Sequence, residues 1–285
     1  MRILHYIAMG FFLLGTFNLA GQEVIQKASA TIEKSYGKGI VGVVVYGEKA
    51  SVKVQGWNGS EVKVLFRPVS RNRDREQAIA DLKYIHYSAE REGDKLVVSN
   101  SFRGKHEQIS SNLTIEIEIF MPHSVAAEIT NLYGPVEITN LTSARATVSF
   151  GSLRVSNISS ECRITTRYSD MELNSVRGIL IVNSEKSDIL TTDLTASTTI
   201  NCSYGEAYLG LAGAGPFIVK GHRTEVGVTV EDFENYRYIL KAMQGIINLP
   251  GGRQVRNELV EKSHESSAGL IDVSTSYCDI TILTN

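Results

Sequence analysis

The chain has 285 residues, of which 42% are hydrophobic and 21% are charged, so it is long enough to bury a core and does not have the composition of a disordered protein. Lysine and arginine number 29 against 31 for aspartate and glutamate, and the formal net charge of -2 leaves no basic excess to neutralise a nucleic acid backbone. With 24 glycines and only 5 prolines the chain is neither collagen-like nor a proline-rich linker, and its short alternating runs of valine, isoleucine and threonine indicate strands.

The first twenty residues have the pattern of a secretory signal. Arg2 precedes an apolar run that ends at the small residue Ala20. The run is short for a membrane span and Asn18 interrupts it, so we predict a signal peptide over residues 1–20, cleaved near Ala20, rather than an N-terminal anchor. No later segment approaches the length of a membrane span. Residues 21–285 are therefore expected to be a single exported domain, in the periplasm, on the cell surface or outside the cell.

Alternating residues predict the first strands from about position 40 onward. The pair Tyr46-Gly47 and the run Val62-Lys63-Val64 place the start of the strand region there. Residues 71–92 are richer in helix formers, which predicts a short helix or ordered loop, an irregular insertion that starts no new domain. Strands are expected again at Lys95–Ser99 and Leu113–Phe120.

An anchor pair recurs every 17 or 18 residues in the middle of the chain. It is an aromatic residue followed by a small one, with a lysine replacing the aromatic residue once, and it returns after an insertion at Tyr277-Cys278. The regular anchors are Tyr133-Gly134, Phe150-Gly151, Tyr168-Ser169, Lys186-Ser187 and Tyr204-Gly205. A unit this short cannot bury its own apolar face, so neighbouring units must stack.

Mostly aliphatic residues occupy fixed positions around each anchor, four residues before it and three, five and eight residues after it. The positions three and five residues after the anchor lie on one face of a strand. We therefore predict an all-β fold, a right-handed parallel β-solenoid with units of about 18 residues. A β-sandwich is the alternative, but it gives no reason for the recurring anchor. The columns are Ile129, Ala146, Ile164, Val182, Ile200 and Val273 (four before); Val136, Leu153, Met171, Ile189, Ala207 and Ile280 (three after); Ile138, Val155, Leu173, Thr191, Leu209 and Ile282 (five after); and Leu141, Ile158, Val176, Leu194 and Ala212 (eight after).

The region after Ala212 is less regular. Short strands are expected at Phe217–Lys220, Val226–Val230 and Tyr238–Leu240. The glycines after Pro250 and the polar residues that follow predict a long exposed loop around residues 250–268.

The three cysteines, Cys162, Cys202 and Cys278, form no C-x-x-C pair and have no histidine at metal-ligand spacing. This pattern predicts neither a structural zinc site nor a disulfide framework, although one disulfide stays open as an alternative. We expect them to be small buried residues. Cys202 shares a column of mostly small residues with Val148, Thr166 and Ser184, which favours its burial.

Several segments together resemble a bacterial family of provisionally named adhesins built from β-strand repeats. They are the run from Ser51 to Val64 around Gly56-Trp57-Asn58-Gly59, the strand that ends in Met121-Pro122, and the successive Tyr-Gly and Phe-Gly units. The resemblance covers about residues 40 to 285. It implies a right-handed β-helical exported protein of unknown function and brings no catalytic residues with it.

An acidic column follows the anchors at a distance of two residues. Asp170, Asp188 and Glu206 lie in it, with Asp279 further on. Stacked about 5 Å apart, these carboxylates are weak candidates for a ligand-binding edge that could take calcium or a polycation. The alternative is that they cap tight turns through backbone hydrogen bonds and stay solvated. We assign no metal site and no cofactor.

The aromatic anchors form a second candidate. Tyr133, Phe150, Tyr168 and Tyr204 could present an outward strip for sugar rings or could pack inside. They share the parity of Ile164 and Ile200, so we expect them to point inward if each strand is unbroken.

These observations predict an exported, non-enzymatic binding or surface-interaction protein, adhesin-like, whose partner is an extracellular or envelope ligand such as a glycan or a protein. A carbohydrate-active β-helix enzyme that uses Asp170 and Asp188 is one alternative, because glycoside chemistry needs convergent carboxylates. A passive envelope scaffold is the other. No nucleic acid partner is expected.

Overall fold

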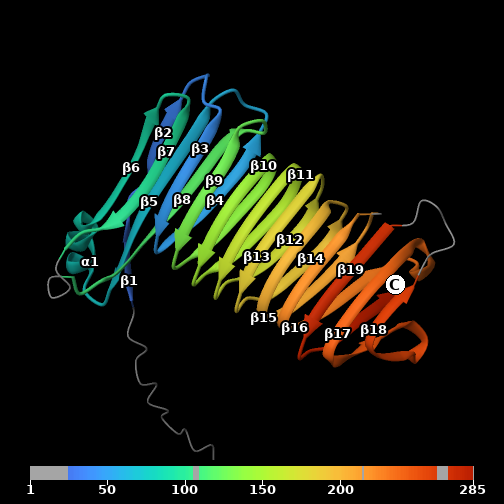
Figure 1. Ribbon diagram of the computed structural model, residues 1–285. Coiled ribbons are helices and arrows are strands. Elements are labelled where there is room, and N and C mark those ends of the chain that lie inside the picture. Colours follow the sequence, from blue (N-terminus) through green and yellow to red (C-terminus); the bar gives the residue numbers. More distant parts are fainter. Residues whose placement is uncertain (1–24, 105–108, 214, 262–268, 285) are drawn as a thin grey trace, which may run out of the picture.

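The computed structural model describes residues 25–104, 109–213, 215–261 and 269–284, and these form an all-β fold with one short α-helix. Their strands lie side by side along one long axis (Figure 1). The predicted signal peptide over residues 1–20 lies outside the described residues. Within the described ranges, no helix is long and apolar enough to cross a membrane.

Two ladders of parallel strands, here called ladder A and ladder B, run through the middle of the molecule. Ladder A contains β3 (Gly42–Glu48), β9 (Ala126–Leu132) and β13 (Ile179–Glu185). Ladder B contains β4 (Ala50–Trp57), β12 (Asp170–Val176) and β14 (Ile189–Leu194). Five long strands bend from one ladder to the other and so belong to both: β10 (Pro135–Ser149), β11 (Ser152–Arg167), β15 (Ser197–Leu211), β16 (Phe217–Val230) and β17 (Tyr236–Asn248).

The register of ladder B follows the spacing of the anchors. In ladder B, Val136 pairs with Leu153, Leu153 with Met171, and Met171 with Ile189, so neighbouring units differ by 17 or 18 residues. Because β11 and β15 pair in both ladders, β11, β12, β14, β15 and β13 form a closed ring of parallel pairings. The β-sandwich alternative expects antiparallel pairs here and is wrong for these strands.

Antiparallel strands close the N-terminal end. Among β1 (Gln26–Ser29), β2 (Ile32–Tyr36), β5 (Val62–Asn72), β6 (Ile85–Glu92), β7 (Lys95–Phe102) and β8 (Asn112–Pro122), strand β5 pairs with β8 and β6 pairs with β7. The predicted helix is present as α1 (Arg75–Asp81), whose first turn is capped by the Asp74 carboxylate, followed by η1 (Leu82–Tyr84). The insertion predicted over residues 71–92 is too long, because residues 85–92 form β6.

The first corner of the stack is Lys49, although the letters Tyr46-Gly47 resemble the later anchor pairs. Val52 pairs with Val136, which places Lys49 opposite Tyr133, whereas Tyr46 lies inside β3 and pairs with Thr130. Gly47 differs from the anchor glycines in what a Cβ would meet. At Gly47 the Cβ would collide with the side chain of the buried Asn131, whereas at the anchor glycines it would meet a backbone carbonyl of the neighbouring unit.

The chain order and the spatial order differ at the C-terminal end. Strands β19 (Gly269–Ser276) and β20 (Ile280–Thr284) lie between β16 and β17 (Tyr236–Asn248), with η3 (Phe233–Asn235) before β17 and η4 (Pro250–Gly252) after it (Figure 1). Strand β18 (Gln254–Glu261) pairs antiparallel with β17. The predicted loop around 250–268 is therefore wrong for residues 254–261, which form β18. Exposed polar residues such as Arg256, Asn257 and Glu258 hide the alternation of this strand in the sequence. The remaining residues 262–268 lie outside the described ranges.

Burial follows the predicted columns. Nearly all of the predicted aliphatic positions are buried, and Cys162 and Cys202 are buried with them, whereas Cys278 is half-buried. Ala212 is the exception: it is exposed and Leu211 is buried instead, because the register between β14 and β15 shifts after Thr191. All three cysteines are free, so the structure does not contain the disulfide that the sequence left open as an alternative.

Candidate functional site

Each unit turns from ladder A to ladder B at a residue with left-handed backbone angles. The φ angle is 61° at Tyr133, 56° at Phe150, 51° at Tyr168 and 58° at Tyr204. A residue in this conformation interrupts the alternation of a strand, so parity cannot be carried through it. The expected inward packing of these rings is therefore wrong: all four are exposed on one edge of the molecule, Tyr204 to 43%.

The small residue after each anchor lies close to the backbone of the preceding unit. A Cβ added at Gly134, Gly151 or Gly205 would meet a backbone carbonyl of the neighbouring unit. Where serine replaces glycine, its hydroxyl enters the inter-unit bonding: Ser169 Oγ accepts the Gly151 N–H at 3.0 Å. The aromatic-small pair therefore marks the positions where the backbones of neighbouring units lie close together.

The exposed rings cover one another. The centroids of Tyr133 and Phe150 lie 5.3 Å apart and those of Phe150 and Tyr168 lie 5.1 Å apart, with the planes nearly parallel. Lys186 continues the column, donating to the Tyr168 hydroxyl at 2.7 Å. That hydrogen bond raises the pKa of Lys186. Since the faces of these rings are covered by neighbours, the strip has few open faces on which a sugar ring could stack.

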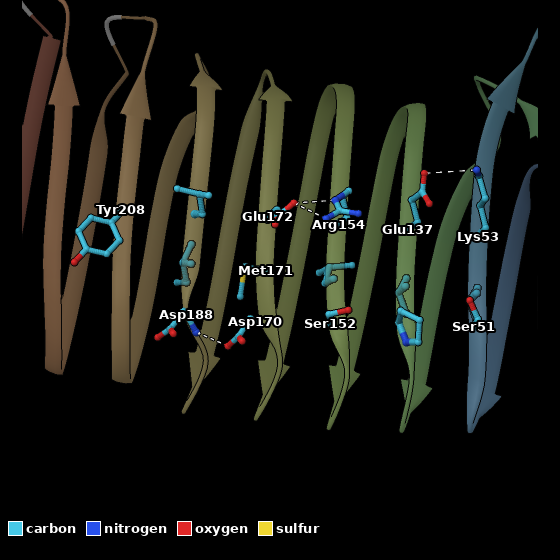
Figure 2. Close-up of a pocket in the computed structure, with 16 residues that line it drawn as sticks. Ser51, Lys53, Glu137, Ser152, Arg154, Asp170, Met171, Glu172, Asp188 and Tyr208 are labelled. Carbon is cyan, nitrogen blue, oxygen red and sulfur yellow. Dashed lines mark hydrogen bonds and ion pairs between the residues drawn. The ribbon is translucent and has the colours of Figure 1, made fainter. Parts of the chain in front are cut away.

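A groove of about 470 Å³ lies on the outward face of ladder B (Figure 2). It crosses β4, β10, β11, β12, β14 and β15, so residues far apart in the sequence meet there. The outward side chains that line it are Ser51, Lys53, Pro135, Glu137, Ser152, Arg154, Asp170, Glu172, Asp188, Leu190 and Tyr208.

One half of this groove carries alternating charges. Lys53 lies 3.7 Å from Glu137, and Arg154 lies 2.8 Å from Glu172 (Figure 2). The hydrogen bond from Arg154, and its positive charge, lower the pKa of Glu172. Within each pair the two opposite charges neutralise each other, so this wall of the groove is polar but has no net charge. Because both pairs are exposed to solvent, they contribute little to stability.

The structure separates the predicted acidic column into two groups. Asp170 Oδ1 accepts the backbone N–H of Asp188 at 3.1 Å, and Asp188 Oδ1 accepts that of Glu206 at 2.9 Å. Both aspartates line the groove, whereas Glu206 does not. Asp279 likewise accepts the Ile246 N–H at 2.8 Å. These bonds favour the capping interpretation, and the described residues hold no group of three or more histidine, cysteine or acidic side chains that could bind a metal.

Tyr208 closes the other end of the groove, and sequence reasoning missed it. It pairs in register with Gly227, and a Cβ on Gly227 would collide with the Tyr208 ring. The ring therefore lies flat across β16, and Figure 2 shows its face turned away from the sheet. Beside it lies Leu190, which is 47% exposed, while Tyr208 is 39% exposed. An outward tyrosine opposite an outward glycine is the signal that could have found this platform.

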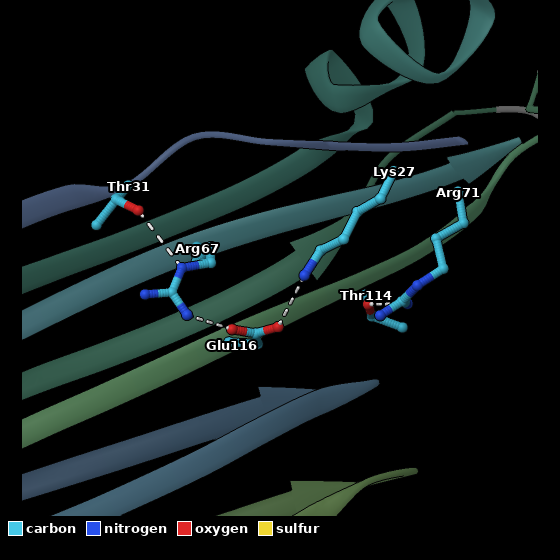
Figure 3. Close-up of polar contacts among 6 residues, drawn as sticks. All are labelled: Lys27, Thr31, Arg67, Arg71, Thr114 and Glu116. Atoms are coloured by element: carbon cyan, nitrogen blue, oxygen red, sulfur yellow. Dashed lines mark hydrogen bonds and ion pairs between the residues drawn. The ribbon is translucent and has the colours of Figure 1, made fainter. Parts of the chain in front are cut away.

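A separate polar network lies at the N-terminal end. Glu116 accepts from Arg67 at 2.6 Å and lies 3.7 Å from Lys27 (Figure 3). Arg71 donates to the Thr114 hydroxyl at 3.2 Å. These contacts join β1, β5 and β8 and hold the antiparallel end together.

Comparison with known proteins adds little. No family model matches the chain, and no curated protein matches it. A solved structure from Clostridium sporogenes ATCC 15579, provisionally named a cell adhesion protein, is similar over 90% of this chain and all of that chain, at 14% identity and a TM-score of 0.30. A likeness this remote carries no argument about the site.

Proposed function

We propose that the protein is an exported, non-enzymatic binding or surface-interaction module, adhesin-like, built as a right-handed parallel β-solenoid. Its contact surface is the groove on ladder B, and its ligand is a glycan of the cell envelope or surroundings. The parallel pairing at 17- and 18-residue intervals supports the solenoid, and the predicted signal peptide supports export.

One observation carries the proposed binding function: the Tyr208 ring lies flat on the sheet beside a groove with polar walls. An aromatic ring with one open face offers apolar area for the C–H face of a sugar. Asp188 and Asp170 supply carboxylates in the half of the groove nearer to the ring, and Glu137 and Lys53 supply charges at its far end. A flat ring flanked by a few polar groups is typical of a ligand site.

The enzyme alternative finds less support. Asp170 and Asp188 each accept a backbone N–H of the next unit, so both carboxylates act as turn caps. Catalysis of glycoside cleavage needs one carboxyl that gives a proton and another that stays ionised, set by different surroundings. The two aspartates occupy equivalent positions in successive units, which does not separate their roles.

The test is a glycan screen on the mature protein, with chemical analysis of any bound glycan for cleavage. We expect saturable binding without cleavage, about tenfold weaker binding for Tyr208→Ala, and retained binding for Tyr208→Phe. Tyr46→Ala, at an exposed tyrosine on ladder A, is the matched control and should bind normally.

Two results would replace this proposal. Cleaved product that disappears in Asp170→Ala or Asp188→Ala would establish an enzyme. An absence of binding to glycans and to envelope proteins would favour the passive scaffold.

A further inference from the structure

Arg223 occupies the corner position between two exposed tyrosines. Its guanidinium carbon lies 5.6 Å from the centroid of the Tyr204 ring and 5.4 Å from that of Tyr277. These rings belong to the neighbouring units on either side, because β16 pairs with β15 and with β19 and β20. His222 packs edge-on against both tyrosines and contacts the Ser276 hydroxyl at 2.9 Å. The guanidinium is therefore flanked by rings and fixed in position.

The donors of Arg223 remain available. A guanidinium carries five N–H donors in its plane, and contact with rings leaves that edge open. In the part of the chain that the structure describes, Arg223 forms no ion pair within 4.0 Å. It is exposed at the edge of the molecule.

The nearest carboxylates in the repeat are engaged elsewhere. They lie two residues beyond each corner, on the ladder B side. Asp188 and Asp279 accept backbone N–H groups at 2.9 and 2.8 Å, and Glu225 accepts from the Tyr208 hydroxyl at 3.4 Å. Glu206 also interacts with that hydroxyl. The guanidinium donors of Arg223 therefore face solvent, where an anion from outside can reach them.

We propose that Arg223, held between Tyr204 and Tyr277, is an oxyanion-binding site for the carboxylate or sulfate groups of an acidic polysaccharide. A planar guanidinium binds such groups through two parallel hydrogen bonds. Lys186 lies two units away along the same edge, so the Cα atoms of the two residues are about 10 Å apart at the usual spacing of strands. The Lys186 ammonium itself lies on the far side, over the Tyr168 ring. A linear chain with repeated acidic groups that follows this edge can contact both cations. The inference rests on the proposed glycan-binding function and adds the class of glycan.

The experiment measures binding of the mature protein to dextran sulfate, polygalacturonate and neutral dextran at two salt concentrations. We expect both acidic polymers to bind, with weaker binding at higher salt. Arg223→Ala should weaken acidic binding about 10- to 100-fold, and Arg223→Lys should restore part of it. Arg177→Ala, an exposed arginine at the opposite corner, is the control and should bind as the unmodified protein does.

The outcomes separate this site from the groove. Acidic binding that survives Tyr208→Ala but not Arg223→Ala supports the site even if the groove is inactive. Unchanged acidic binding in Arg223→Ala, or equal loss in Arg177→Ala, overturns it. Equally strong binding of poly-glutamate would also overturn it, because the partner would then be any polyanion. If the protein binds only neutral glycans and Tyr208→Ala abolishes that binding, the proposed glycan-binding function is supported and the Arg223 site is not.

Discussion

Two buried threonines with the same exposure have opposite hydrogen-bonding states. Thr191 and Thr198 are each 1% exposed. The Thr198 hydroxyl donates to the Ala196 carbonyl at 2.9 Å, whereas the Thr191 hydroxyl has no partner among the described residues. Thr191 lies in an aliphatic column between Leu173 and Leu209. A buried hydroxyl without a partner loses its hydration and gains nothing in return.

We therefore expect Thr191→Val to raise the free energy of unfolding by about 1 kcal/mol, because valine has nearly the same shape and no polar group to desolvate. Thr198→Val should lower it by about 1 kcal/mol, because a made hydrogen bond is lost. Urea denaturation of the two variants checks the pair. Equal destabilisation by both would show that the Thr191 hydroxyl has a partner.

The Cys162 thiol makes stability depend on pH in the alkaline range. Burial, and then the charge of Glu161, raise its pKa to about 12. The unfolded thiol releases its proton near pH 9, so this contribution is fully present below that pH and is lost as the pH rises toward 12.

In reducing buffer, the advantage of the unmodified protein over Cys162→Ala should shrink by about 1 kcal/mol between pH 8 and pH 10. Denaturant titrations of both proteins at the two pH values measure this double difference. Subtracting the values of the two proteins cancels the contribution that lysines and tyrosines make to the pH dependence of the unfolding free energy. A difference that stays constant would mean that the thiol is accessible to water in the folded state.

At the scale of the element, the aspartates two residues after the corner tie one strand to the next. Asp188 accepts the backbone N–H of Glu206 in the following unit. Within the described residues, the Glu206 carboxylate accepts no backbone N–H of β16, and Glu206 pairs in register with Glu225. Asp188 and Glu206 are thus an acidic pair in one column with different structural roles.

Asp188→Ala should lower the free energy of unfolding by about 1 kcal/mol, since the lost hydrogen bond is charge-assisted but exposed. Asp188→Asn keeps an acceptor oxygen and should cost less, and Glu206→Ala is the control with a smaller effect. Thermal unfolding of the three variants, with and without millimolar Ca²⁺, measures both points. A rise in the melting temperature with Ca²⁺ that Asp188→Ala abolishes would restore the calcium interpretation.

The corners show where sequence reasoning about elements fails. Spacing alone located Tyr133, Phe150, Tyr168 and Tyr204 as one column, but their direction was predicted wrongly. The direction in which a side chain points depends on the φ angle of its residue. An aromatic residue in the sequence does not indicate a left-handed backbone conformation, because glycine and asparagine are the residues that usually adopt it. Tyr46-Gly47 has the same letters without a corner, because its glycine makes room for the Asn131 side chain.

At the scale of the whole molecule, the parallel pairing of the middle strands was predictable because the same pattern of buried positions recurs along the sequence. The ends were not. The N-terminal strands pair antiparallel, and β17 and β18 lie beyond β19 and β20 although they precede them in sequence. The groove was missed for a different reason: Lys53, Arg154 and Tyr208 come together on the outward face through strand register, which the hydropathy pattern does not record.

The parallel register between neighbouring units positions the caps, the groove and the Arg223 corner. Asn183 and Asn201 pair across β13 and β15 on the outer face of ladder A, and the Asn201 amide donates to Asn183 Oδ1 at 3.1 Å. Their Cα atoms stand at the spacing of neighbouring strands, which a disulfide can bridge.

The decisive measurement is oxidative crosslinking of Asn183→Cys paired with Asn201→Cys, in a Cys278→Ser background that leaves the two buried native thiols in place. We predict that the disulfide forms readily in the folded protein. The pair Asn183→Cys and Ser203→Cys, offset by two residues along the strand, should form it poorly because its Cα atoms are more than about 7 Å apart. Equal or preferential crosslinking of the offset pair would contradict the register and the surfaces derived from it.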